Sequence, residues 1–241
     1  MSGPETATRP VKSFYLRSVR IGAVASGLLV VALLTITRTE AAFSGTTQNQ
    51  TNTFDAAASF AINLHLHNNP TPPTGNTTSQ DLLPLDATEP TATTLRNYDT
   101  DRDAAEGLLL AKGSGLGETD LVKFQRWRHT PSSSLTLSGT AQLTIYTAMK
   151  DFTAGKSGAV DVGLYDCTTG GSSCTQLASG SASQNPWPNT WQAVTVDLGA
   201  VSHTVASGRA LIIKVVVSDS SGDDLLFAYD TTAYASELEI S

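Results

Sequence analysis

Charged and aromatic side chains are both scarce in this sequence of 241 residues: 15% of the residues are charged and 7% are aromatic. Basic residues are the rarer sign, with 15 Lys and Arg against 22 Asp and Glu, for a net charge of −7. A surface of that charge does not neutralise phosphates, which excludes nucleic acid as a partner. The hydrophobic content of 40% is too high for a wholly disordered chain. The length allows one domain of up to about 200 residues with appendages.

Long hydrophobic runs are absent except for one, at residues 21–36. As a helix this run spans about 24 Å, which is less than the bilayer's hydrocarbon core of about 30 Å. A positively charged segment precedes it, and small residues follow at Thr39 and Ala41, as in an export signal. We therefore predict a helical signal peptide at residues 1–41, removed by signal peptidase after Ala41 or Ala42. The alternative is a leader that is retained as a single-pass membrane anchor.

Cysteine occurs only twice, as Cys167 and Cys174. The six residues between them, TTGGSS, form a Gly/Ser-rich turn that can bring two strand ends within disulfide distance. An oxidising environment outside the cell favours this bond over two unpaired thiols. The pair predicts a hairpin closed by a disulfide.

The sequence just after the predicted cleavage point resembles the start of camelysin/TasA-type surface and matrix proteins. The matching elements are Ala42-Phe43, the Thr/Asn-rich stretch from Thr46 to Thr53, Asn52-Thr53-Phe54 and a hydrophobic strand from Phe60 to Leu66. The resemblance implies a dedicated signal peptidase and a destination at the cell surface or in the extracellular matrix. The Gly that usually follows this family's Phe-x-Ala is replaced by Ala57.

Residues 42–67 are predicted to form an N-terminal strand arm with one apolar face. That face consists of Phe60, Ile62, Leu64 and Leu66. Because four large side chains must be covered, the arm pairs either with an edge of its own domain or with an edge of a neighbouring copy. The second alternative predicts self-assembly.

A Pro/Thr-rich segment at residues 68–94 follows the arm and contains five of the ten prolines. Proline lacks a backbone donor and restricts φ, so a regular central strand or helix is not expected here. We predict a semi-extended linker or a wrapping arm, with Leu82, Leu83 and Leu85 as a docking point.

From residue 95 to residue 241, short β-rich runs alternate with Gly, Ser and Asp breaks. The runs lie near 106–112, 121–129, 134–138, 141–149, 158–166, 174–179, 190–198, 209–217, 224–229 and 234–240. The run at 209–217 is apolar almost throughout, as in a strand that is buried on both faces. Strands at this spacing predict an all-β fold, an antiparallel β-sandwich of jelly-roll type.

Three segments of this domain resemble jelly-roll domains of exported actinobacterial proteins, in the carbohydrate-binding-module and galactose-binding-like class. They are YDTDRDAAEGLLLAKG at 98–113, KFQRWRH at 123–129 and DDLLFAYDTTAYASELEI at 223–240. The resemblance implies a non-catalytic sandwich that carries glycan or calcium sites.

A dense group of carboxylates is the candidate metal site. Its members are Asp99, Asp101 and Asp103, with Asp224 and Asp230 as partners from the end of the chain. Alternating carboxylates suit a hard cation such as Ca²⁺, although the spacing does not match an EF-hand. The alternative is a solvated acidic turn in which Arg102 pairs locally.

Tryptophan suggests a ligand-binding surface at Trp187 and Trp191. Trp187 lies in NPWPN, where prolines and asparagines predict an irregular loop, and a loop Trp offers a flat face for a sugar ring. The alternative is that Trp187 folds back over the domain edge while Trp191 packs in the core.

Catalytic motifs are missing: there is no G-x-S-x-G elbow, complete P-loop or G-x-G-x-x-G. We therefore expect no enzyme. The predicted function is an exported cell-surface or matrix protein with a structural or adhesive role, which meets the membrane only through its leader. The alternative is a secreted glycan-binding module, whose partners are surface glycans.

Overall fold

The structure is a computed structural model, and it describes residues 61–69, 81–96, 98 and 107–241, all within the unit Ala57–Ser241. The predicted signal peptide lies outside the described residues. So do Phe60 of the assembly face and three residues of the calcium site, Asp99, Asp101 and Asp103. No helix in the described part of the chain has the length and apolar character needed to span a membrane.

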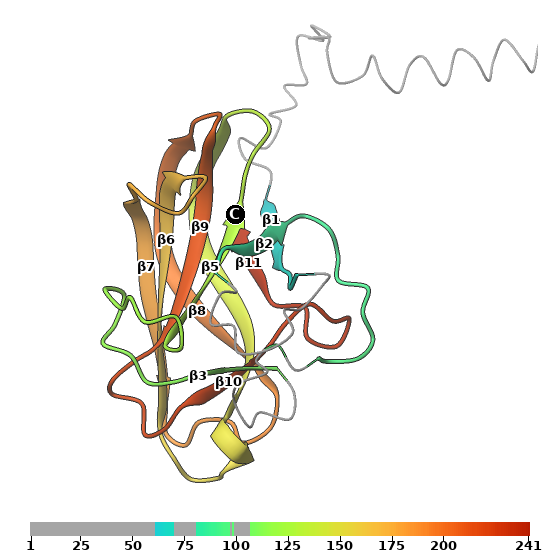
Figure 1. Cartoon of the computed structure of the whole chain (residues 1–241), viewed down its shortest axis with the longest axis vertical. Helices are drawn as coiled ribbons and strands as arrows, with labels where there is room; N and C mark the ends of the chain where they lie inside the picture. The colour runs from blue at the N-terminus through green and yellow to red at the C-terminus, as the bar shows by residue number, and fades with distance from the viewer. Residues whose placement is uncertain (1–60, 70–80, 97, 99–106) are drawn as a thin grey trace, which may run out of the picture. The chain divides into compact units, whose positions relative to one another are not determined.

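The regular secondary structure of the described residues is nearly all β (Figure 1). The strands are β1 (Ile62–Leu66), β2 (Leu83–Asp86), β3 (Leu108–Leu110), β4 (Phe124–His129), β5 (Leu135–Met149), β6 (Gly158–Thr168), β7 (Thr175–Gln184), β8 (Gln192–Val205), β9 (Arg209–Val217), β10 (Leu225–Ala228) and β11 (Glu237–Ile240). A single 3-10 turn, η1 (Lys150–Phe152), follows β5.

The strands form one mixed sheet in the order β3-β10-β5-β11-β1-β2-β4-β9-β6-β7, with β8 paired to β5. The expectation of a wholly antiparallel sheet is wrong, because β2 and β4 pair in parallel. A parallel pair needs a long crossover, which the segment that contains β3 supplies. The sheet curls back on itself, so that β7 contacts β8. A Cβ added to Gly180 of β7 would lie 1.9 Å from the Asp197 carbonyl oxygen of β8.

Strand β1 occupies an internal position in this sheet. It pairs antiparallel with β11 on one side and with β2 on the other. Leu64 and Leu66 are buried, Ile62 packs against the same core, and His65 on the opposite face is also buried. The arm therefore pairs within its own chain, as an integral strand of the sheet. Exchange of the arm between copies stays a prediction.

The proline-rich segment contains a strand, contrary to the expectation of a linker without one. Leu83 and Leu85 are only 2% and 1% exposed, whereas Pro84 between them faces solvent. The Pro84 carbonyl accepts a hydrogen bond from the backbone N–H of His67 at 3.0 Å. Proline is tolerated here because this contact uses its carbonyl and requires no N–H donor.

The two runs predicted at 134–138 and 141–149 are one continuous strand, β5. A register shift between Ala141 and Gln142 marks a β-bulge against β8. Gly139 adopts φ 144°, and a Cβ there would lie 2.3 Å from the carbonyl oxygen of Ser241. Gly139 thus lets Ser241 approach β5 closely. In the sequence, the same glycine resembles a break between two strands.

The core lies between the two halves of the curled sheet. Every residue of β9 after Arg209 is buried, as the apolar run predicts. Three large aromatic residues lie together in the core. Tyr98 stacks on Tyr229 with ring centroids 4.5 Å apart, and Trp127 contacts Tyr229 edge-on with a centroid distance of 5.2 Å.

Candidate functional site

A cavity of about 390 Å³ opens where β1 and β2 end. Its lining comes from residues 67–69, from β2, from the irregular segment at 88–98 and from Asp230, which follows β10. Pro90 lacks a backbone donor and residues 88–96 form no strand, while Asp230 adopts a left-handed φ of 59° that Asp tolerates better than most residues. Segments far apart in the sequence therefore meet at one polar site.

His67 links three of these segments. Its Nδ1 lies 2.7 Å from Asp230 Oδ1, its Nε2 lies 3.0 Å from the Thr88 carbonyl oxygen, and the same Nε2 lies 3.5 Å from Asp86 Oδ1. The other oxygen of Asp230, Oδ2, accepts the backbone N–H of Asn68 at 3.0 Å. The end of β1 is thus attached to the loop after β10 by two hydrogen bonds.

The contacts of His67 favour its protonated form. A carboxylate and a carbonyl both accept hydrogen bonds, so the ring must donate from both nitrogens, which only the imidazolium does. The hydrogen bond to Asp230 is the main cause that raises the pKa of His67 above its ordinary value, against the opposing effect of burial. In its protonated form, which the raised pKa favours, His67 is a cation held by carboxylates and has no free lone pair to act as a base.

Replacing His67 by Gln is expected to lower the free energy of unfolding by about 1.5–3 kcal/mol at about pH 5.5, because a charge-assisted hydrogen bond is lost. The folded-state pKa is raised, so this contribution is complete below the unfolded pKa and is lost as pH rises through the folded pKa. Urea denaturation of both proteins at about pH 5.5 and pH 8.5 should show the difference shrink at the higher pH. A difference that does not change with pH would contradict the assignment.

His65, on β1, lies two residues before His67 and is also flanked by acids. Its Nε2 is 3.5 Å from Glu89 Oε1, and its Nδ1 is 3.9 Å from Glu237 Oε2. Strand β1 and the residue that follows it therefore present two histidines, and each lies between two carboxylates that come from different segments. The sequence signal for this arrangement is the His-x-His spacing, which places both rings on one strand face.

The two predicted calcium ligands that the structure describes lie at opposite ends of β10. Asp224 accepts the backbone N–H of Lys112 at 3.0 Å and faces Lys150 Nζ at 3.6 Å, while Asp230 is engaged by His67. Five residues lie between them, four of which form β10, and a chain extended over that length spans roughly 15–20 Å, so the two carboxylates cannot share one ion. Among the described residues, no group of three or more His, Cys, Asp or Glu is placed to hold a metal. Calcium binding stays a prediction.

The placement of Trp187 at the surface is wrong. Its side chain is 1% exposed, and Nε1 donates to Thr147 Oγ1 at 3.3 Å in the core. A buried indole presents no face to a sugar ring. The prediction of an irregular loop is confirmed. A loop residue can still turn an apolar side chain into the core, and the Trp187 ring packs there against Gly158.

Trp191 belongs to a row of aromatic rings that sequence reasoning missed. Its ring lies 5.6 Å from Phe152 and 5.8 Å from Tyr234, and Tyr234 in turn lies 5.4 Å from Tyr146. Phe152 is 43% exposed. The four residues are spread over about ninety positions of sequence, so no local pattern indicates that they meet.

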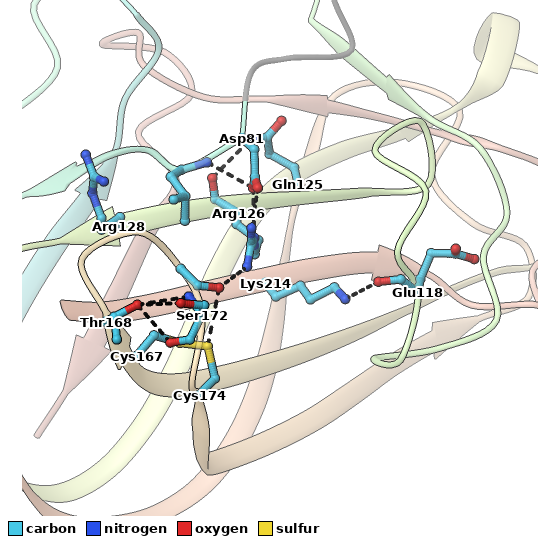
Figure 2. A network of polar contacts seen from close by, with 12 residues as sticks. Asp81, Glu118, Gln125, Arg126, Arg128, Cys167, Thr168, Ser172, Cys174 and Lys214 are labelled. Atoms are coloured by element: carbon cyan, nitrogen blue, oxygen red, sulfur yellow. Dashed lines mark hydrogen bonds and ion pairs between the residues drawn. A yellow bond between two sulfur atoms is a disulfide. The ribbon is translucent and has the colours of Figure 1, made fainter. Parts of the chain in front are cut away.

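Figure 2 shows a second polar cluster, which anchors the disulfide hairpin. The disulfide joins Cys167 and Cys174, with the sulfurs 2.02 Å apart. Arg126 forms a two-point ion pair with Asp81 and donates to the carbonyl oxygen of Gly171, inside the disulfide loop, at 2.9 Å. The hairpin is thereby tied to β4 and to the residues that lead into β2.

Lys214, on β9, is the buried cation of this cluster. Its Nζ donates to the carbonyl oxygens of Leu116 (2.8 Å) and Glu118 (2.5 Å) and lies 4.4 Å from the ring centroid of Phe124. Burial is the main cause that lowers the pKa of Lys214. All three donors of the ammonium face protein groups, so we interpret this cluster as a clamp on the loop before β4.

The chemistry of the first site follows from its partners. The hydrogen bonds of the described histidines run to carboxylates or carbonyls: His67 to Asp230 and Thr88, His129 to the Leu85 carbonyl and His203 to Asp166. The cavity beside His67 is therefore equipped to bind a polar ligand through charge and hydrogen bonding.

Comparison with known proteins gives matches only in structure. No family model matches the sequence, and no curated protein matches it. A CocE/NonD family hydrolase from Staphylococcus aureus matches with a TM-score of 0.51 and 10% identity, over 78% of this chain and 37% of the hydrolase. A second crystal structure of that hydrolase gives a TM-score of 0.52 over the same shares.

An aminopeptidase from the marine sediment archaeon Thaumarchaeota archaeon matches with a TM-score of 0.51 and 12% identity, over 75% of this chain and 36% of the aminopeptidase. The chain thus spans a little over a third of the length of these enzymes. At such low identity the similarity shows a shared fold.

This finding overturns the functional reading of the sequence. The β-rich pattern predicts a non-catalytic protein with a structural or adhesive role, or else a glycan-binding module. The matching structures are hydrolases, so the inference from this fold to a non-catalytic role is wrong. Strand periodicity indicates the fold, whereas the chemistry of a protein depends on the sites that the fold carries.

Proposed function

We propose that this chain is the β-sandwich component of a hydrolase that cleaves ester or amide bonds. Three quarters or more of the chain matches just over a third of each hydrolase, which supports a component rather than a complete counterpart. The sheet that curls back over its core supports the finer assignment of a jelly roll.

The polar cavity beside His67 is the site to which we assign this function. It combines a concave shape with a histidine, a guanidinium and three carboxylates, which are groups that can orient a polar ligand by charge and hydrogen bonding. In the proposed enzyme the cavity holds a polar part of the substrate. The leader and the camelysin-like opening support export, so we place this hydrolysis at the cell surface or outside the cell.

The test measures hydrolysis by the full chain in two preparations. One is the recombinant protein alone, and the other is the tagged chain recovered from the exported fraction of its own host. With p-nitrophenyl acetate and leucine p-nitroanilide as substrates, at least one preparation should exceed a mock purification by about ten-fold or more. Activity of the recombinant chain would place the catalytic groups within it, and activity of the host preparation alone would place them on a partner. Rates at the mock level in both would overturn the proposal.

A further inference from the structure

We propose that the cavity beside His67 binds a small zwitterion, a molecule that carries an ammonium group close to a carboxylate, as an α-amino acid does. The inference rests on the proposed function, because cleavage of an amino acid ester or of a terminal peptide bond releases such a molecule. It is carried by hydrogen-bonding groups in the lining that the protein itself leaves unused.

The first unused group is a buried donor. Asn68 lines the cavity and is only 6% exposed. Its side-chain Oδ1 accepts the backbone N–H of Asn69 at 2.9 Å, which settles the orientation of the amide, and its Nδ2 has no hydrogen-bond partner. A buried N–H without an acceptor is rare in folded proteins, and a ligand oxygen would satisfy it. Arg96 adds an exposed guanidinium to the same lining.

The unused acceptors are carboxylate oxygens. Both oxygens of Asp230 are already engaged, one by His67 and the other by the backbone of Asn68. Asp86 uses Oδ1 for the backbone N–H of Thr88 and keeps its side chain 46% exposed, and the Glu89 carboxylate is 81% exposed. Asp86 and Glu89 therefore have oxygens available for an ammonium group.

The charge of the lining favours a ligand with both signs. Three carboxylates (Asp86, Glu89 and Asp230) and two cations (Arg96 and the His67 imidazolium) sum to −3 + 2 = −1. A simple anion would be repelled by the free carboxylates, and a simple cation would leave Asn68 Nδ2 without an acceptor. An α-amino acid satisfies the donors with its carboxylate and the acceptors with its ammonium group, and about 390 Å³ leaves room for its side chain.

The experiment is a calorimetric titration of the full chain with L-leucine and with two analogues that each lack one charged group. 4-Methylpentanoate lacks the ammonium group, and 3-methylbutylamine lacks the carboxylate. Leucine should bind saturably, and each analogue should bind at least about ten-fold more weakly. Equal binding of leucine and either analogue would overturn the inference, as would the absence of binding by leucine.

Variants locate the site. Asn68→Ala and Asp86→Asn should each weaken leucine binding about ten-fold, and Glu89→Gln repeats the test at a side chain that is 81% exposed. Asp219→Asn, an exposed residue outside the cavity, is the matched control and should bind as the unaltered chain does. Unchanged affinity in Glu89→Gln and in a folded Asp86→Asn would overturn the assignment. If leucine fails to bind while the hydrolysis assay succeeds, this inference falls and the proposed function stands.

Discussion

A chain that begins at Asn68, and so lacks β1, is expected not to fold. Strand β1 lies between β11 and β2, and its loss would leave the backbone groups of both neighbours unpaired. It would also remove Leu64 and Leu66, which are 3% and 1% exposed, and each buried leucine contributes about 2–5 kcal/mol. Together with the lost ladder, this approaches the whole stability of a typical domain, about 5–15 kcal/mol.

The matched control for this truncation is a chain that begins at Ala57, which keeps the entire unit Ala57–Ser241. Circular dichroism during heating should show a cooperative transition for the control and none for the shorter chain. A cooperative transition in the shorter chain would mean that β1 is a dispensable arm. That result would restore the picture of a detachable strand available for exchange between copies.

Replacing Trp187 by Ala is expected to destabilise the protein by about 3–5 kcal/mol, because removal of a fully buried indole leaves a large cavity. The ring lies against Gly158, where an added Cβ would come within 2.3 Å of it, so the surrounding backbone is closely fitted to the indole. The variant also leaves Thr147 without the indole N–H, which donates to its hydroxyl at 3.3 Å. Urea denaturation measures the change in the free energy of unfolding.

Trp191→Ala is the comparison variant for this experiment. Trp191 is half-buried and its ring contacts are edge-on or tilted, so its loss should cost about 1–2 kcal/mol. A small effect at Trp187 together with a large effect at Trp191 would reverse the placement of the two rings. Trp187 would then belong to the surface, where a loop tryptophan was first expected.

Local sequence patterns predicted most strands correctly, for a simple reason. Alternation of apolar and polar residues with a period of two, as in Leu143 and Ile145 of β5, depends only on which side chains face the core. The disulfide between Cys167 and Cys174 was equally accessible, because a seven-residue separation through a Gly/Ser turn is a local geometry. Prolines misled the prediction at β2, where the pairing needs a carbonyl and not an N–H at Pro84.

The candidate site could not be predicted in this way. His67 and Asp230 are 163 positions apart, and they meet because β1 pairs with β11 and the loop after β10 turns back over its end. The all-β class, the disulfide and the acidic, low-charge surface follow from composition and short-range periodicity. Strand order, the internal place of β1, the burial of Trp187 and the unpaired amide of Asn68 depend on contacts between distant segments. Those contacts arise only when the whole sheet closes around one core, because local periodicity determines which face of a strand is buried but not which strand lies beside it.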